Sequence, residues 1–218
     1  MVQLVPDATT ILAPREAAEA LCSAWVTMFG KSPSLTTLAT LWAQTAFETA
    51  RWTSMHCYNW GNVRKISNPD DQHNWCQYSC SEYKGNVLEK YHPPDPRCCF
   101  RAYTSAASGA LDYLIVLSRK VRYKDAWQVL LDGGSVEEFV HRLKVGDGTP
   151  ASGGYFTDKE EHYLAGVKHY YDEFMAKHTS VLECVAAETV ASTNGTGTTN
   201  GTRTTPVLVL PDGAIKNP

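Results

Sequence analysis

The sequence of 218 residues has a small net charge, no long apolar run and no stretch near its start that is typical of a secretion signal. The formal net charge is −3, so we expect no basic surface for nucleic acid. No run of 18 apolar residues occurs, so we expect no membrane-spanning helix. The first twenty residues contain Asp7, Arg15 and Glu16 and no unbroken apolar stretch, so we expect no Sec-type signal peptide.

Cysteine is concentrated in one part of the chain. Cys22 and Cys184 lie outside this part, and the other five of the seven cysteines are Cys57, Cys76, Cys80, Cys98 and Cys99. The clustering favours one or two disulfides that hold a loop-rich lobe, with a free thiol left over because the count is odd. Free buried thiols and a zinc site are the alternatives, although Cys76-x3-Cys80 differs from the usual C-x2-C spacing. For the active centre we predict no metal and no cofactor.

Helical periodicity covers much of the remaining sequence. Residues 14–29 are expected to form a helix, with Pro14 in the first turn and Gly30 after the last. Ser34 is expected to cap a second helix, in which Leu38, Trp42 and Ala46 follow helical spacing. Further helices are predicted at 106–121, 124–131, 136–143 (capped by Ser135) and 158–177.

The periodicity dissolves between residues 54 and 99, where prolines, aspartates and the cysteines indicate an irregular or short-stranded lobe. We therefore predict a helix-rich domain over 14–185 that contains this lobe, preceded by an N-terminal extension over 1–13. Residues 186–205 include an almost pure Ser, Thr, Asn and Gly stretch and are predicted to be a flexible linker. Residues 206–218 form a short apolar tail.

One carboxylate, Glu48, stands in the apolar helix "LWAQTAFETARW". Burial by Phe47 and Trp52 would favour its neutral form, and the negative end of the helix dipole acts in the same direction. Both effects suit a general acid that gives up its proton near neutral pH. The alternative is an ordinary surface ion pair between Glu48 and Arg51, three residues further on.

A polar turn with aromatic neighbours, "YNWGN", follows this helix. Aromatic rings stack on the apolar faces of sugars, and amide side chains hydrogen-bond to hydroxyl and N-acetyl groups. We therefore predict that Tyr58, Asn59 and Asn62 bind a saccharide next to the acid.

Three stretches together resemble the lysozyme-like glucosaminidases that cut bacterial peptidoglycan. "LATLWAQTAFETARW" with "CYNWGNVR" resembles the family's catalytic helix end and its Asn-x-x-Gly-Asn turn. "CCFRAYTSAASGALDYLIVL" resembles its Phe-Arg-x-Tyr segment, and "GGYFTDKEEHYLAGVKHYY" its Tyr-x-Thr-Asp segment. The resemblance covers about residues 15–178, and the segments occur in the family's order.

The resemblance implies a mainly α, lysozyme-like helical domain with an irregular, cysteine-rich inserted lobe, and a glycan strand bound between the two. It implies that Glu48 is the general acid, that Tyr155 is an active-site tyrosine and that Asn62 lies near the substrate. Gln44, one turn before the acid, is expected to line the cleft. Phe156 is added to the predicted substrate-binding residues.

No motif identifies a second catalytic carboxylate. The candidates are Asp70, Asp71, Glu82 and Glu89. We choose Glu82 because it follows the Cys76 and Cys80 pair, which would hold its loop still. Inverting and retaining hydrolases place such a group differently, and a lytic transglycosylase needs only the single acid. The choice between a hydrolase and a transglycosylase therefore stays open, and the sequence does not indicate which bond of the β-1,4 glycan of GlcNAc and MurNAc is cut.

Two other classes of function compete with a glycosidase. One is a non-catalytic wall-binding or virion structural module on the same fold. The other is a cysteine peptidase or amidase that uses Cys57 or Cys99 with a histidine. A wall enzyme would act in the periplasm, outside the cell or on a virion, and the tail would suit attachment to a larger assembly. Aromatic residues at helical spacing near the C-terminus, Tyr163 among them, are predicted to be core.

Overall fold

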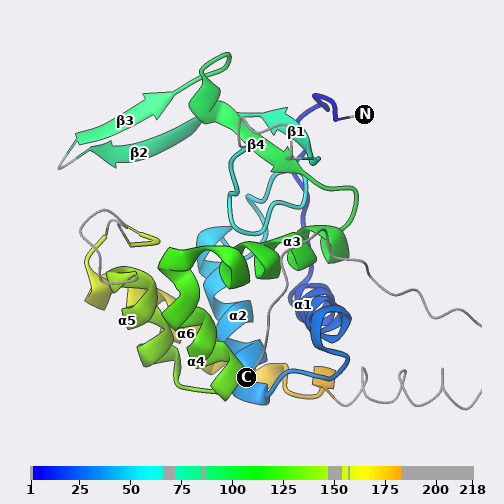
Figure 1. Cartoon of the computed structure of the whole chain (residues 1–218), viewed down its shortest axis with the longest axis vertical. Coiled ribbons are helices and arrows are strands. Elements are labelled where there is room, and N and C mark those ends of the chain that lie inside the picture. The colour runs from blue at the N-terminus through cyan, green and yellow to red at the C-terminus, as the bar shows by residue number, and fades with distance from the viewer. Residues whose placement is uncertain (1, 66–71, 85–86, 147–153, 157, 183–218) are drawn as a thin grey trace, which may run out of the picture.

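The computed structural model describes residues 2–65, 72–84, 87–146, 154–156 and 158–182, with only the backbone for residues 82–84. Within these residues, six α-helices form a helical body and short strands form a β lobe beside it (Figure 1). The mainly α fold class is confirmed. The helices are α1 (Pro14–Phe29), α2 (Leu35–Glu48), α3 (Ala106–Arg119), α4 (Lys124–Asp132), α5 (Val136–Val145) and α6 (Glu160–Lys177).

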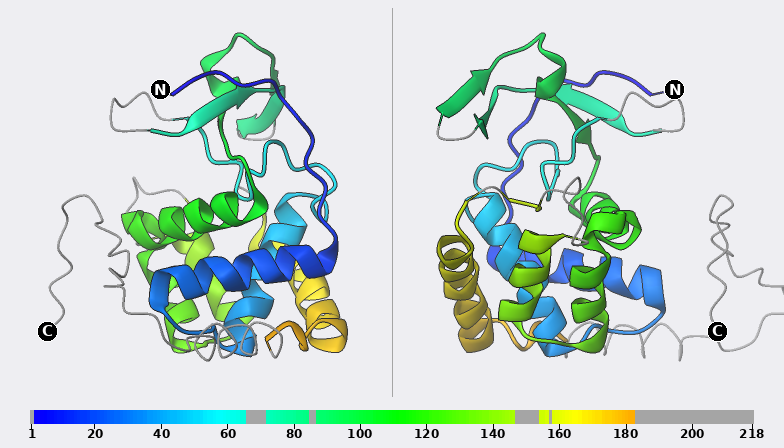
Figure 2. Two further views of the ribbon diagram at one scale, coloured as in Figure 1. Left: turned by 90° about the vertical axis from the view of Figure 1, so that its right-hand side faces the viewer. Right: turned by 60° about the vertical axis from the view of Figure 1, so that its left-hand side comes forward.

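Helix α2 is the centre of the body, with the other helices around it (Figures 1 and 2). All residues from Thr37 to Ala46 are buried, as expected for a helix that is apolar nearly all round. The indole ring of Trp42, on α2, contacts the rings of Trp52 and Phe174 at centroid distances of 4.9 and 5.4 Å. Glu48, the last residue of α2, therefore directly follows a helical segment that is buried in the core.

The helix boundaries follow local signals in the sequence. Ser34 and Ser135 cap α2 and α5, since their hydroxyl groups accept from the backbone N–H of Thr37 and Glu138 at 3.0 and 3.2 Å. Both caps and the bounds of α1 are confirmed. Helix α6 begins at Glu160, slightly later than predicted. No helix in the described ranges is long and apolar enough to cross a bilayer.

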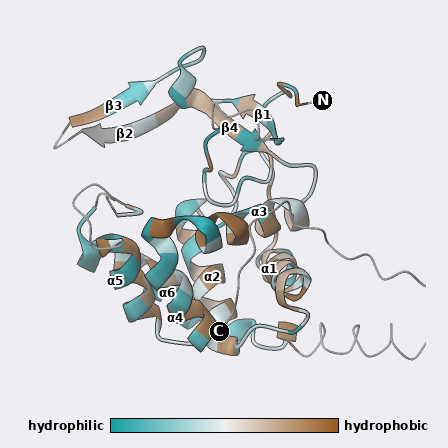
Figure 3. Ribbon diagram, viewed as in Figure 1, coloured by the Kyte–Doolittle hydropathy of each residue, from teal (hydrophilic) through white to brown (hydrophobic). Residues whose placement is uncertain are grey.

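The β lobe consists of two antiparallel pairs of short strands. Strand β1 (Asn74–Gln77) pairs with β4 (Cys99–Ala102), and β2 (Cys80–Lys84) pairs with β3 (Val87–Tyr91). The lobe therefore ends at residue 102 rather than 99. Two apolar side chains at the start of β3, Val87 and Leu88, are 64% and 45% exposed and colour this end of the hairpin brown in Figure 3.

The N-terminal extension is hydrogen-bonded to the lobe. The backbone N–H of Val5 donates to the carbonyl of Trp75 at 2.8 Å, and that of Trp75 donates to Gln3 at 3.1 Å. The stretch then runs down to α1 and links lobe and body (Figure 2). The predicted linker and tail, 186–218, lie outside the described residues.

A buried polar network joins the lobe to the body. Both carboxylate oxygens of Asp112, on α3, accept from Arg101 on β4, at 2.9 and 3.1 Å. Tyr103 also donates to Asp112, and the imidazole of His73 lies 3.2 Å from it. Burial acts to raise the pKa of Asp112, but His73, Tyr103 and Arg101 together outweigh it and lower that pKa to about 2.

The six described cysteines are free thiols. The disulfides predicted from the clustering are therefore not formed in this structure, and Cys184 lies outside the described residues. Cys22, Cys57, Cys76 and Cys98 are buried. The backbone pairing of β1 with β4, together with the network around Asp112, holds the lobe in place instead.

Candidate active site

Glu48 is the last residue of α2 and lines a cleft of about 1070 Å³ between the helical body and the β lobe. Its side chain is partly buried. The alternative of a surface pair with Arg51 is wrong, because the Arg51 guanidinium pairs with Glu173 on α6 at 2.5 Å. The carboxyl group thus lines the cleft, and its hydrogen-bond partner among the described residues is the hydroxyl of Tyr163.

A series of hydrogen bonds between buried side chains orients the carboxyl group of Glu48. The hydroxyl of Tyr163 on α6 donates to Oε1 of Glu48 at 2.6 Å. The Nε2 amide of Gln44 donates to the Tyr163 hydroxyl at 3.4 Å, and its Oε1 accepts from Tyr113 on α3. One oxygen of Glu48 is therefore an acceptor fixed by three helices, which leaves the other oxygen to carry a proton.

Burial has the largest effect on the pKa of Glu48. It raises the pKa of Glu48, and the hydrogen bond from Tyr163 opposes this rise only in part. Burial, and then the charge of Glu48, raise the pKa values of Tyr113, Tyr155 and Tyr163, so all three hydroxyls keep their protons. The site therefore favours a neutral carboxylic acid next to neutral hydrogen-bond donors.

The walls of the cleft are aromatic, polar and cationic. On the side of the helical body, Phe156 stacks on Tyr163 with ring centroids 3.7 Å apart. On the side of the lobe, Tyr78 stacks between His56 and Phe100 at 4.0 and 4.1 Å. The other lining residues include Tyr155, Tyr123, Asn62, Ser79, Ser81, Leu88, Arg64, Lys120, Arg122 and Asp158.

The turn between α2 and the lobe is conformationally strained. Its non-glycine residues with positive φ are Ala50, Arg51, Trp52, Cys57, Tyr58 and Asn62. Such residues persist where the surroundings determine the backbone, and they are common at functional sites. Here the surroundings include the fully buried indoles of Trp52 and Trp60.

Two of the three residues predicted from this turn do not lie in the cleft. Asn59 is completely buried, and its amide is used by the backbone of Val63 and Arg101 at 2.8 to 2.9 Å, so the prediction that it binds substrate is wrong. Tyr58 packs against the core and is absent from the cleft lining. Asn62 does line the cleft, where its Oδ1 accepts from Tyr78 at 3.2 Å.

The other predicted residues fall into three groups. Tyr155 and Phe156 line the cleft. Gln44 is fully buried beneath it and contacts the Tyr163 hydroxyl, which corrects the expectation that it lines the cleft. Glu82 lies in β2 opposite Glu89, and its side chain is outside the described residues.

Sequence reasoning missed Tyr163 and Tyr113. Tyr163 was predicted to be core, and it is buried, but its hydroxyl contacts the acid. It is 115 residues from Glu48, and an aromatic residue at helical spacing carries no signal for such a contact.

The cysteine alternative finds no support in the contacts of its two nucleophile candidates. The thiol of Cys57 donates to the carbonyl of Pro6 at 3.7 Å, and the sulfur of Cys99 accepts from Gln77 at 3.3 Å. A nucleophilic cysteine needs a histidine as its partner, and neither contact supplies one.

Comparison with known proteins gives two similar structures. No protein-family model and no curated protein matches the chain. A C-terminally truncated glycoside hydrolase domain of FlgJ from Salmonella typhimurium is similar with a TM-score of 0.46 and 16% identity, covering 75% of this chain and 99% of that one. A peptidoglycan hydrolase mutant from Sphingomonas sp. A1 gives 0.48 and 19%, covering 78% and 93%. At these values neither similarity by itself identifies a substrate or a reaction.

Proposed function

We propose that this protein is a glycosidase that cleaves the β-1,4 glycan of peptidoglycan with Glu48 as its general acid. The observation that supports this proposal best is the placement of Glu48: its carboxyl group has a raised pKa, accepts a hydrogen bond from Tyr163 and lines the cleft. The carboxyl would protonate the bridging oxygen while positive charge develops on the sugar ring.

The composition of the cleft fits this substrate class. Aromatic rings on both walls suit the apolar faces of pyranose rings. The cations Arg64, Lys120 and Arg122 suit a glycan that carries carboxylates on its lactyl groups and stem peptides. We propose that the enzyme acts on the cell wall; attachment to a virion through the tail stays a prediction, since the tail lies outside the described residues.

The second carboxylate is proposed to be Glu82, which lies in the lobe on the other side of the cleft from α2. Asp158 is the only acidic residue besides Glu48 in the described lining, and it is the matched alternative. If Glu82→Gln loses activity and Asp158→Asn does not, the lobe supplies the base or nucleophile. If both variants keep activity, a mechanism with a single acid, such as lytic transglycosylation, is favoured.

The decisive experiment compares Glu48→Gln with the parent protein on purified sacculi. Gln keeps the shape and removes the proton, and loss of a general acid typically lowers the rate by about 10²–10⁴-fold. Glu161→Gln, an exposed acid on α6, is the matched control and should act at the parental rate. Parental activity in Glu48→Gln would refute the assignment, and binding to sacculi without release by the parent would favour the non-catalytic wall-binding module.

Mass spectrometry of the released fragments identifies the bond. A reducing-end GlcNAc indicates a glucosaminidase, a reducing-end MurNAc a muramidase and an anhydro-MurNAc end a lytic transglycosylase.

A further inference from the structure

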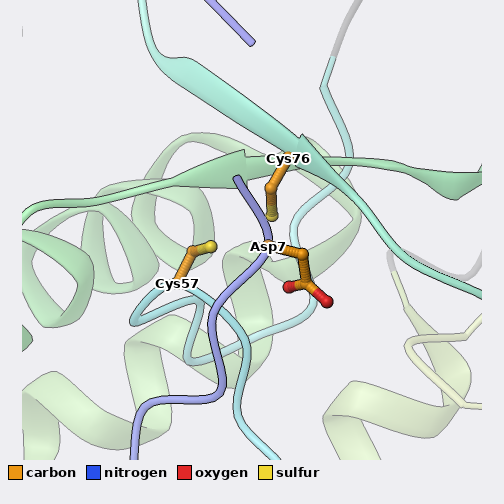
Figure 4. Close-up of side chains that lie close together, drawn as sticks. All are labelled: Asp7, Cys57 and Cys76. Carbon is orange, nitrogen blue, oxygen red and sulfur yellow. The ribbon is translucent and has the colours of Figure 1, made fainter. Parts of the chain in front are cut away.

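A second cluster of reactive side chains lies at the junction of the lobe and the body. A carboxylate oxygen of Asp7 and the sulfur atoms of Cys57 and Cys76 all lie within 4.8 Å of one another. They come from the N-terminal stretch, the turn after α2 and strand β1 (Figure 4). These three segments are distant in sequence and meet at this point.

The surroundings of the cluster make three anions unfavourable there. Cys57 and Cys76 are 5% and 0% exposed and pack with Ala102 in a small apolar cluster. A bound cation would remove this penalty, because thiolates and a carboxylate are stabilised by a shared positive charge.

The backbone holds the three donors in place. The N–H of Cys57 donates to the carbonyl of Ala8 at 2.8 Å, next to Asp7 in sequence. Trp75, next to Cys76, exchanges hydrogen bonds with the N-terminal stretch. The Nδ1 atom of His56 lies 2.8 Å from Oδ1 of Asp7, the kind of outer partner that orients a metal ligand.

We propose that Asp7, Cys57 and Cys76 form a binding site for a divalent cation of the zinc class. Two thiolates select zinc over magnesium or calcium, and a water molecule would complete the usual four ligands. On binding, each thiol releases its proton to water, and no electron is transferred. The ion would fasten the N-terminal stretch and β1 to the end of the turn that follows Glu48. This proposal does not depend on the activity proposed above.

The spacing in the sequence gives no indication of this site. Cys76-x3-Cys80 is the pair that a search for zinc motifs considers, whereas the structure brings Cys76 to Cys57 and an aspartate from the N-terminus. A Cys57–Cys76 disulfide is the competing outcome. It would need an oxidant that accepts two hydrogens, and it would make no use of Asp7.

The test uses the full chain, purified under reducing conditions without a chelator, and titrated with Zn²⁺ and with Co²⁺. We expect one equivalent of zinc and, with cobalt, the near-ultraviolet thiolate-to-metal charge-transfer band. Asp7→Asn changes an exposed side chain and should weaken zinc binding by about tenfold or more, and His56→Ala by about 10–100-fold. Cys76→Ser should lose the cobalt band.

The controls are Cys99→Ser and Asp125→Asn, which each remove the same functional group outside the cluster and should bind zinc like the parent. Circular dichroism checks that every variant is folded. If Cys76→Ser does not fold, the Asp7→Asn titration still decides the question. Equal affinity in Asp7→Asn and the parent, no stoichiometric zinc in the parent, or a Cys57–Cys76 cross-linked peptide in freshly isolated protein would each overturn the proposal.

Discussion

The helical body and the β lobe are stabilised in different ways. The body buries a continuous apolar core around α2, with Trp42, Leu38 and Leu41 completely inaccessible. The lobe has two strand pairs, and its own cluster of buried residues is Cys57, Cys76 and Ala102. A two-stranded sheet is marginal by itself. The lobe therefore depends on specific polar contacts with the body, while the body depends on packing.

The largest effect is expected where the two regions join. Asp112→Ala leaves the guanidinium of Arg101 buried without its carboxylate, which typically costs about 3–5 kcal/mol of unfolding free energy. Denaturant unfolding measures this loss, and hydrogen exchange should rise in β4 before it rises in α2. Asp132→Ala, an exposed acid on α4, is the control. Equal loss in both variants would show that the network does not hold the lobe.

Packing of the body is tested at the contact of α2 with α6. A Cβ atom at Gly166 would lie 2.2 Å from the ring of Phe47, so either this ring or one of the two helices must shift. Gly166→Ala should lower the unfolding free energy by about 1–3 kcal/mol and also reduce activity, because Phe47 precedes Glu48. Ala165→Val, on the exposed face of the same helix, should change stability by less than about 0.5 kcal/mol.

Lowering the pH should weaken the network around Asp112, which joins the lobe to the body, before it affects the apolar core. The pKa of Asp112 is lowered from 3.8 to about 2, so its contribution is complete above pH 4 and is lost as the pH falls towards 2. The expected loss is up to about 2 kcal/mol. Urea unfolding at pH 5 and pH 2.5 measures it, with Asp112→Asn as the reference. A parent and variant with the same pH dependence would assign the acid effect to other groups.

The smallest effect concerns the tuning of the acid. Burial raises the pKa of Glu48, and the hydrogen bond from Tyr163 partly offsets this rise. Tyr163→Phe removes this hydrogen bond and should therefore raise the pKa of Glu48 further. If Glu48 is the proposed general acid, activity falls as the pH rises through its pKa, and this fall should move to higher pH in the variant. Tyr171→Phe, also on α6, should leave the profile unchanged. A lower rate with an unshifted profile would indicate a purely structural role for Tyr163.

Sequence signals were most reliable where they act locally. The caps Ser34 and Ser135, the helix that carries Glu48, and its apolar surroundings follow from neighbouring residues and helical spacing. The hydrogen-bond chain through Gln44, Tyr163 and Tyr113 did not follow, because its members lie on three helices. The prediction for Asn59 is wrong because an asparagine in a turn is equally suited to binding a sugar and to hydrogen-bonding the backbone. Only the tertiary packing distinguishes the two.

The sequence by itself determined a helical body with a carboxylate at the end of its most apolar helix, since the 3.6-residue period and the caps act within single turns of helix. The tertiary structure alone decided the surroundings of that carboxylate and of the cysteines. Tyr163 reaches Glu48, and Asp7 reaches Cys57 and Cys76, across long stretches of chain. Contacts of this kind depend on how helices and strands pack together, and burial then fixes which groups keep their protons.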